Sequence, residues 1–282
     1  MRRTFRVTLV LVLGLIAMFP IFTRSITDSM LFHPEPGQSR TPSAVGLGFS
    51  ELELMGQDGT RIQAWWIPYR GEATNRNITL VTFHGNAGTM ADRLQHTRLL
   101  HDLGVSVLAV EYRGYGNSDG APSEEGLALD AQAALEEARR RTQHGKVVVH
   151  GRSLGGAVAV RLASDFPVDG LIIESTFTSL GAMAARTSIP LARRLVAYSF
   201  DSLDRIATID APTLVVHGED DELIPLAMGR ALQEAANADW LPIPGGLHND
   251  TWIVGGATYW QKLASFLSRL SPATEAETTS KD

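Results

Sequence analysis

The sequence predicts an α/β fold with a mostly parallel central sheet, helices on both faces and a small cap. Short, continuous apolar runs such as "ITLVTFH", "VSVLAVEY", "KVVVH", "DGLIIES" and "TLVVHG" are typical of strands buried on both faces of a parallel sheet. Helix-forming stretches separate these runs, and two alternating runs around "GQDG" precede them as an antiparallel hairpin. A chain of 282 residues, 44% of them hydrophobic, is long enough to bury such a core in one domain.

The first 24 residues are predicted to form a signal anchor or a signal peptide. Three arginines precede the uncharged run at residues 7–22, and only Arg24 follows it directly. At about 1.5 Å per residue the run is slightly shorter than the roughly 30 Å hydrocarbon core of a bilayer. The positive charge before it favours a cytoplasmic N-terminus, with the rest of the chain across the membrane. Because no convincing small-residue cleavage site follows, an uncleaved anchor is favoured.

The rest of the chain divides into a linker, one domain and a tail. Residues 25–47 are predicted to be a linker, because Pro, Gly and Ser are frequent there. Residues 48–270 form the predicted domain, and the polar residues 271–282 a disordered tail. Residues 177–210 make an unusually long connection between two strands, which favours a small cap over the sheet. A helix followed by a long loop is the alternative.

The strongest local motif is the turn after "KVVVH", where Gly151-Arg152-Ser153-Leu154-Gly155 has the pattern G-x-S-x-G. Between a strand and a helix, this pattern holds a nucleophilic serine in a strained turn, and the glycines leave room for it. The alternative is that Ser153 only caps the helix that follows.

A serine hydroxyl needs a histidine to take its proton and a carboxylate to orient that histidine. His248 comes late in the chain, and before it three adjacent acids, Glu219, Asp220 and Asp221, follow the strand "TLVVHG". The order Ser, acid, His is the one expected of this fold. Spacing alone leaves the choice among the three acids open.

Acyl transfer also needs N–H groups that bind an oxyanion. The residue after the nucleophile, Leu154, supplies one, and the loop "FHGNAGT" supplies another through the backbone of Asn86. The same loop lacks the G-K-[ST] ending of a phosphate-binding loop. The histidines at strand ends (His84, His150 and His217) lack the spacing of a metal motif, so structural hydrogen bonding is predicted for them, and Glu174 is interpreted as structural.

Together these segments resemble the Bem46-like group of α/β-hydrolases, within the serine aminopeptidase-like superfamily. The matching blocks are "HGNAG", "EYRGYGNSDG", "GRSLGGAVA", "IIESTFTSL", "HGEDDELIP" and "GGLHNDTW", in family order. The resemblance implies the α/β-hydrolase fold, assigns the acid to Asp221 and the histidine to His248, and implies a membrane segment ahead of the domain.

The predicted function is hydrolysis of an ester or thioester, with an amide as a further option, through an acyl-Ser153 intermediate. The expected substrate is a small-molecule or lipid-like acyl compound, with no metal or organic cofactor. The net charge of −6 without a basic block argues against nucleic acid, and the absence of cysteine excludes a thiol nucleophile. The domain is expected on the non-cytoplasmic side of a membrane. The alternative is a non-catalytic hydrolase-fold module that binds a lipid or a partner protein.

Overall fold

The structure is a computed structural model that describes residues 18, 21–71, 75–189 and 192–271. Its main feature is an eight-stranded sheet with the strand order β10-β9-β8-β7-β4-β6-β3-β2. The β2–β3 and β3–β6 pairs are antiparallel and the other pairs are parallel, so the expected hairpin and parallel sheet are both present. The strands are β2 (Ser50–Met55), β3 (Arg61–Ile67), β4 (Ile78–Phe83), β6 (Ser106–Val110), β7 (Lys146–Arg152), β8 (Gly170–Glu174), β9 (Thr213–Gly218) and β10 (Asp239–Ile243).

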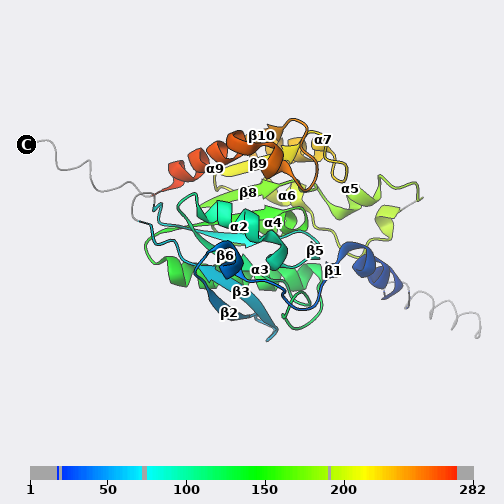
Figure 1. Ribbon diagram of the computed structural model, residues 1–282. Helices are drawn as coiled ribbons and strands as arrows, with labels where there is room; N and C mark the ends of the chain where they lie inside the picture. The colour runs from blue at the N-terminus through cyan, green and yellow to red at the C-terminus, as the bar shows by residue number, and fades with distance from the viewer. Residues whose placement is uncertain (1–17, 19–20, 72–74, 190–191, 272–282) are drawn as a thin grey trace, which may run out of the picture.

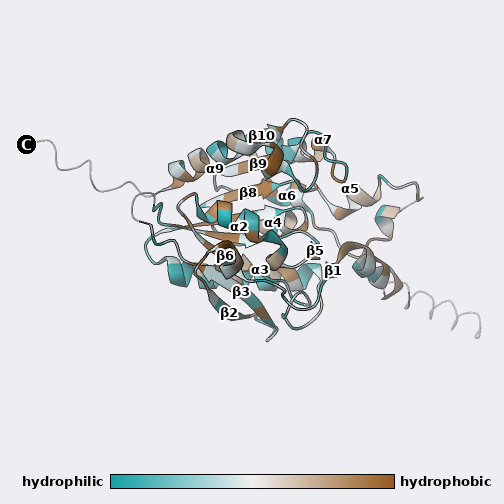
Figure 2. Cartoon of the chain, in the orientation of Figure 1, coloured by the Kyte–Doolittle hydropathy of each residue, from teal (hydrophilic) through white to brown (hydrophobic). Residues whose placement is uncertain are grey.

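Helices cover both faces of this sheet (Figure 1). On one face, α2 (Leu94–His101) and α9 (Gly256–Leu270) pack against alternate strand residues, such as Leu80 and Val148. The opposite face carries α3 (Glu124–Thr142), α4 (Leu154–Asp165), α6 (Ser202–Ile206) and α7 (Leu226–Ala236). The central strands are therefore buried on both faces and mostly apolar, with threonines as the polar exceptions in β4, and Figure 2 shows brown stretches within the sheet. The predicted fold class is confirmed.

The strand order reverses direction beside β4, which pairs with β6 on one side and β7 on the other. Such a reversal brings the loops after neighbouring strands together at the carboxyl edge, where α/β folds bind ligands. The loop after β4 carries Asn86 and the turn after β7 carries Ser153. Pairing of Phe83 with Gly151 at the ends of these strands places the two loops side by side.

Residues 25–47 are folded onto the domain, so the prediction of a linker there is wrong. Residues 21–31 are helical, and β1 (His33–Pro34) pairs in parallel with β5 (Ala87–Gly88). Phe32 and Leu47 are buried, because this stretch carries enough apolar side chains to pack on the domain despite its many prolines and glycines. The folded body therefore begins well before residue 48.

Two contacts fix this N-terminal helix to the rest of the molecule. At its end, the Leu31 carbonyl accepts a hydrogen bond from the Asn86 side chain, at 2.9 Å. On its side, the Thr27 hydroxyl accepts from the Ala197 N–H at 3.0 Å, and the Asp28 carboxylate accepts from the Tyr198 hydroxyl. The helix thus joins the loop after β4 to the segment predicted as a cap.

The predicted cap at residues 177–210 contains the short helices α5 (Leu180–Ala184) and α6 and a 3₁₀ turn, η3 (Ala192–Arg194). In Figure 1, α5 and the blue N-terminal helix lie at the same end of the molecule. No helix within the described ranges is long and apolar enough to cross a bilayer. Most of the apolar run at residues 7–22, like the tail at 272–282, lies outside those ranges.

Candidate active site

Ser153 lies at the sharp turn between β7 and α4 and has φ 54° and ψ −120°. A positive φ is strained for a residue with a Cβ, so the surrounding structure must impose it. A Cβ on Gly151 would collide with the Gly155 carbonyl, and one on Gly155 with the Phe83 carbonyl. The two glycines of the motif are therefore required by close backbone approach. The turn is further held by a hydrogen bond from the Ser153 N–H to the Glu174 carbonyl, at 2.9 Å.

The structure brings Ser153, His248 and Asp221 into one hydrogen-bonded chain. His248 Nε2 lies 3.1 Å from Ser153 Oγ. On the other side of the ring, His248 Nδ1 lies 2.9 Å from Asp221 Oδ2 and 3.1 Å from Oδ1. The serine and the histidine are 95 residues apart in sequence, and only the sheet edge brings them together. Geometry of this kind allows the histidine to accept the serine proton while the carboxylate fixes its tautomer.

Asp221 is held by donors on several sides. Its Oδ1 accepts the N–H groups of Leu223 at 3.0 Å and Ile224 at 2.8 Å. Burial acts to raise the pKa of Asp221, but the hydrogen bonds from His248 and the backbone outweigh it and lower the pKa below its ordinary value. The carboxylate is therefore ionised at neutral pH.

The other acids of this turn do not contact the ring of His248. Glu219 and Asp220 are exposed. Glu222, which the sequence analysis did not single out, accepts the His248 N–H at 3.0 Å, and this bond lowers the pKa of Glu222. It therefore fixes the backbone beside the histidine.

The two N–H groups predicted to bind an oxyanion lie beside Ser153. Leu154 begins α4, and the first N–H groups of a helix have no partner within that helix. The Asn86 carbonyl accepts from the His33 N–H at 3.0 Å and from the Tyr115 hydroxyl at 2.7 Å. Its side chain is also engaged, which leaves the Asn86 N–H as the group available to a ligand. Both residues line the same cavity as Ser153.

This larger cavity has a volume of about 690 Å³, enough for a sizeable ligand. Ser153 and His248 line it together with the loop after β4. Its walls are mostly apolar and come from the N-terminal helix, the cap and the loop before α7: Ile26, Met30, Leu31, Phe177, Leu180, Met183, Ile189, Leu195, Val196, Leu223 and Ile224. Such walls fit an apolar substrate arm rather than a polar one.

The sequence analysis missed the contribution of the N-terminal helix to these walls. A signal was present, because Phe22, Ile26 and Met30 recur every four residues and so share one helix face. Met30 is 66% exposed although it borders the cavity.

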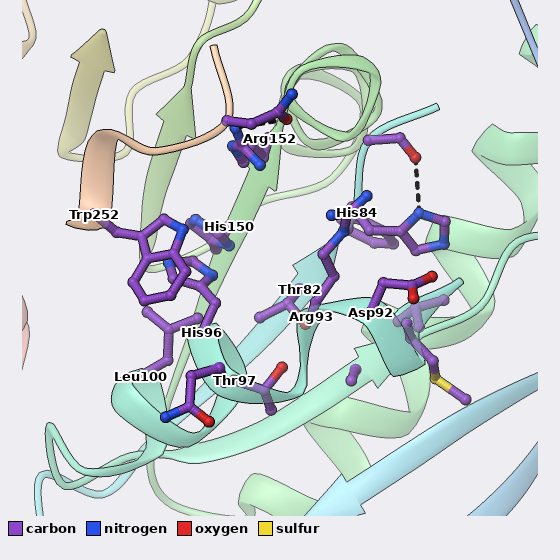
Figure 3. Close-up of a pocket in the computed structure, with 17 residues that line it drawn as sticks. Thr82, His84, Asp92, Arg93, His96, Thr97, Leu100, His150, Arg152 and Trp252 are labelled. Carbon is purple, nitrogen blue, oxygen red and sulfur yellow. Dashed lines mark hydrogen bonds between the residues drawn. The ribbon is translucent and has the colours of Figure 1, made fainter. Parts of the chain in front are cut away.

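A second, smaller cavity of about 120 Å³ adjoins the first (Figure 3). A single water needs roughly 10–15 Å³ measured in this way, so the space holds several waters or a small polar group. Four residues line both cavities: Gly85, Arg93, Arg152 and Asn249. Figure 3 shows Arg93, Arg152, His96, His150 and Trp252 around it.

The three strand-end histidines differ in their surroundings. His84 Nε2 lies 2.8 Å from Glu111, and His217 Nε2 donates to the Ile224 carbonyl at 2.9 Å. Structural hydrogen bonding, as predicted, therefore holds for these two. His150 is buried, and no group of the described residues lies within hydrogen-bond distance of its ring nitrogens, but Nε2 is 3.6 Å from a Glu174 carboxylate oxygen. For His150 the structure shows a close contact with the buried Glu174 carboxylate in place of the predicted hydrogen bond, and the ring also borders the smaller cavity.

Glu174 is fully buried and connects several groups below the site. It accepts hydrogen bonds from Thr251 and, at 3.1 Å, from Tyr259, and Arg152 Nε lies 3.9 Å away. Burial acts to raise the pKa of Glu174, but His150 and the positive charge of Arg152 hold it well below its ordinary value. Arg152 in turn donates to the His248 carbonyl. Glu174 thus supports the loop that carries His248.

One group of side chains in the described part of the chain has metal-ligand types: His96, His150 and Glu174, with ligand atoms within 4.8 Å of one another. Burial and the positive charge of neighbouring groups lower the pKa of His96 to about 3, so its ring is neutral. The Arg152 guanidinium lies 3.9 Å from the Glu174 carboxylate and already compensates its negative charge with its own positive charge. That charge opposes a cation here.

Comparison with known proteins defines the class of this fold. The chain superposes on the Pyrococcus furiosus esterase Pf2001 with a TM-score of 0.73, at 19% identity over 86% of this chain and 99% of the esterase. It also resembles an α/β serine hydrolase without lid from Xanthomonas campestris, with a TM-score of 0.62 at 19% identity over 80% of this chain and 96% of the other. The fold is that of an α/β-hydrolase.

Sequence relatives identify the family. The family model for serine aminopeptidase, S33, matches residues 74–204. The chain is 35% identical to the α/β-hydrolase domain-containing protein WAV2 of Arabidopsis thaliana, over 87% of this chain and 88% of that protein. It is 34% identical to protein bem46 of Schizosaccharomyces pombe, over 81% of this chain and 79% of that protein. The chain belongs to the Bem46-like α/β-hydrolases, as the resemblance of its motifs implied, and is a hydrolase by family.

Proposed function

We propose that the protein hydrolyses an ester or thioester, with an amide as a less favoured substrate, through an acyl-Ser153 intermediate. The observation that carries this proposal is the chain of hydrogen bonds from Ser153 Oγ through His248 to Asp221, opening into a large apolar cavity. The strained turn around Ser153 supports it as well, because such strain is found where a side chain must be presented to a ligand. The similar Pyrococcus furiosus protein is named an esterase, and we extend that activity to this chain as part of the proposal.

In the first half-reaction, Ser153 Oγ attacks the carbonyl carbon while His248 Nε2 takes the serine proton. The electron pair of the C=O bond moves to the oxygen, and the N–H groups of Asn86 and Leu154 stabilise that negative charge. When the C=O bond re-forms, the bond to the leaving group breaks. His248 gives its proton to the departing oxygen or sulfur, and Asp221 stabilises the imidazolium in between.

In the second half-reaction, water takes the place of the leaving group. His248 removes a proton from the water as its oxygen bonds to the acyl carbon. The acyl–Ser153 bond then breaks, and the proton returns from His248 to Ser153 Oγ. The products are the free acid and the regenerated enzyme, and no cofactor takes part.

The walls of the larger cavity favour an apolar acyl arm. Side chains from the N-terminal helix and the cap supply most of its lining. Each methylene that moves from water to an apolar environment contributes about 0.8 kcal/mol. The specificity constant should therefore rise with acyl length until the chain fills the cavity, as expected for a lipid-like substrate.

A fluorophosphonate probe and a series of p-nitrophenyl esters test this function. The wild-type chain should react with the probe and hydrolyse the esters, whereas Ser153→Ala should do neither. The matched control is Ser164→Ala on the same helix, which should keep both properties. Comparing kcat/KM for these esters with acyl-thioesters and aminoacyl-amides of equal chain length shows which bond type the protein prefers. A wild-type chain that neither reacts with the probe nor turns over any ester would support the non-catalytic alternative.

The proposal extends to location: residues 7–22 anchor the chain in a membrane, with the domain on the non-cytoplasmic side. A relative in Saccharomyces cerevisiae, 34% identical over 80% of this chain, is named a membrane protein, which supports the anchoring. The arginines before the run support the orientation. An alkaline phosphatase fused after residue 282 should be active and a cytosolic fluorescent reporter dark. The opposite pattern would place the domain in the cytoplasm.

A further inference from the structure

The smaller cavity contains a positive charge that the triad does not use. Arg93 ends the 3₁₀ turn η2 (Met90–Arg93) and reaches the junction of the two cavities. Its one hydrogen bond within the described residues runs from Nη2 to the Ala87 carbonyl, at 3.0 Å. No carboxylate of the described chain lies within 4.0 Å of it, unlike Arg152, which faces Glu174. A partly buried guanidinium without an anionic partner is an energetically costly arrangement unless a ligand supplies one.

The rest of this cavity also favours a negative group. Groups that can donate line it, including the Asn249 and Gln95 amides and His150, whose Nε2 lies 3.6 Å from Glu174 and whose Nδ1 has no hydrogen-bond partner among the described residues. The one carboxylate in its lining, Asp92, is already engaged by the Thr89 N–H at 2.8 Å. Figure 3 shows the Arg93 side chain extending up toward Arg152. Burial and the charge of Arg152 lower the pKa of Arg93, and the more distant carboxylates Asp92 and Glu111 act in the opposite direction.

The position of the small cavity fits the leaving-group arm of a substrate. Gly85 lines both cavities, and a Cβ on Gly85 would lie 3.6 Å from the Ser153 Cβ, so the junction is beside the nucleophile. Asn249 also lines both cavities and directly follows His248 in the chain. His248 is the group that would protonate the leaving oxygen. The large apolar cavity then remains for the acyl arm.

We propose that Arg93, with Arg152 beside it, binds an anionic group on the leaving-group arm of an ester whose acyl arm is a long apolar chain. The inference rests on the proposed function of Ser153 and narrows its substrate class. The anion is a carboxylate or a phosphate, because both accept a guanidinium through two parallel hydrogen bonds. A molecule of this kind is a single-chain amphiphile, apolar at one end and negatively charged at the other.

Three decanoyl esters test the inference on the full chain: those of glycolic acid, 2-phosphoethanol and ethylene glycol. The first two carry a carboxylate and a phosphate, and the third is neutral. Because their intrinsic reactivities differ, the measured quantity is the kcat/KM ratio of each anionic ester to the neutral one, compared between variants. Arg93→Met should lower this ratio by roughly 10- to 100-fold, the effect of losing a hydrogen bond to a charged group. The ester with the larger loss identifies carboxylate or phosphate as the bound group.

Two variants serve as controls. Arg140→Met makes the same change on the exposed surface of α3, where Glu137 is the one partner of Arg140 among the described residues, and should leave the ratios unchanged. Arg93→Lys keeps the charge without the planar fork and should give an intermediate ratio. If Arg93→Met unfolds, product inhibition of the wild type by glycolate or 2-phosphoethanol gives the answer, with ethylene glycol expected not to inhibit.

The possible results separate this inference from the proposed function. Equal losses for anionic and neutral esters in Arg93→Met, or no loss for either, would overturn the anion site while leaving the hydrolase intact. The same holds if the anionic products inhibit no better than ethylene glycol. If the wild type hydrolyses none of the three esters and Ser153 does not react with a fluorophosphonate, the proposed function itself is refuted.

Discussion

Replacing Asp221 by asparagine should disable the site by turning the histidine into the wrong tautomer. In the structure, Asp221 Oδ1 accepts the N–H groups of Leu223 and Ile224, while Oδ2 lies 2.9 Å from His248 Nδ1. An asparagine would keep its oxygen toward the two backbone donors, which places its NH₂ group against the ring. Nδ1 must then accept a hydrogen bond, so the proton moves to Nε2, and Nε2 can no longer take the proton of Ser153.

The expected loss is about 10⁴-fold in kcat, or about 5 kcal/mol of transition-state stabilisation. Hydrolysis of a p-nitrophenyl ester measures it, and the matched control is Asp220→Asn. Asp220 is exposed and makes no side-chain contact with His248, so the control should keep activity within about threefold. A loss below tenfold for Asp221→Asn, or a larger loss for Asp220→Asn, would refute this account of the histidine.

Four further outcomes test other parts of the structure. Glu174→Ala should lower the free energy of unfolding by about 3–5 kcal/mol in urea melts, because it leaves Arg152 buried without its partner. A change below about 1 kcal/mol, close to the error of such melts, would contradict this. Since burial lowers the pKa of His96 to about 3, the unfolded chain binds the extra proton between about pH 6.5 and pH 3, and stability should fall as the pH falls through that window. His96→Gln should flatten this slope by up to about 1.4 kcal/mol per pH unit, and an unchanged slope would show that His96 is charged in the folded state. Gly155→Ala should abolish activity, because its Cβ meets the Phe83 carbonyl; full activity would mean that the turn is less tight than the structure has it. Ile26→Ser should reduce kcat/KM for decanoyl but not acetyl esters, and equal effects on both would remove the N-terminal helix from the acyl site.

Local sequence determined the fold class and the Ser153 turn. Strands buried on both faces are apolar at most positions, so the runs after residue 78 were visible without any knowledge of their partners. The turn was visible for a similar reason, since close backbone contacts permit only glycine at positions 151 and 155. The order of Ser153, Asp221 and His248 along the chain followed from the order of strand ends in this fold.

Choosing among neighbouring acids needed more than local pattern. Glu219, Asp220 and Asp221 have equal chemistry and adjacent positions, so spacing left them open and only the family resemblance favoured Asp221. The structure gives a physical reason for the difference. Asp221 turns inward, where backbone N–H groups and His248 compensate its burial, while Glu219 and Asp220 face solvent.

Only the tertiary structure decided what surrounds the serine. Residues 25–47 have the composition of a linker, yet residues 26–31 form part of the wall of the larger cavity, because their position depends on contacts with the cap 170 residues away in the chain. The same is true of Arg93: its sequence neighbours suggest an ordinary helix start, and its role depends on where β7 and the loop after β4 place Arg152 and Gly85. Short-range patterns record the conformation of the backbone, whereas the shape and charge of a cavity depend on side chains that meet only after the chain has folded.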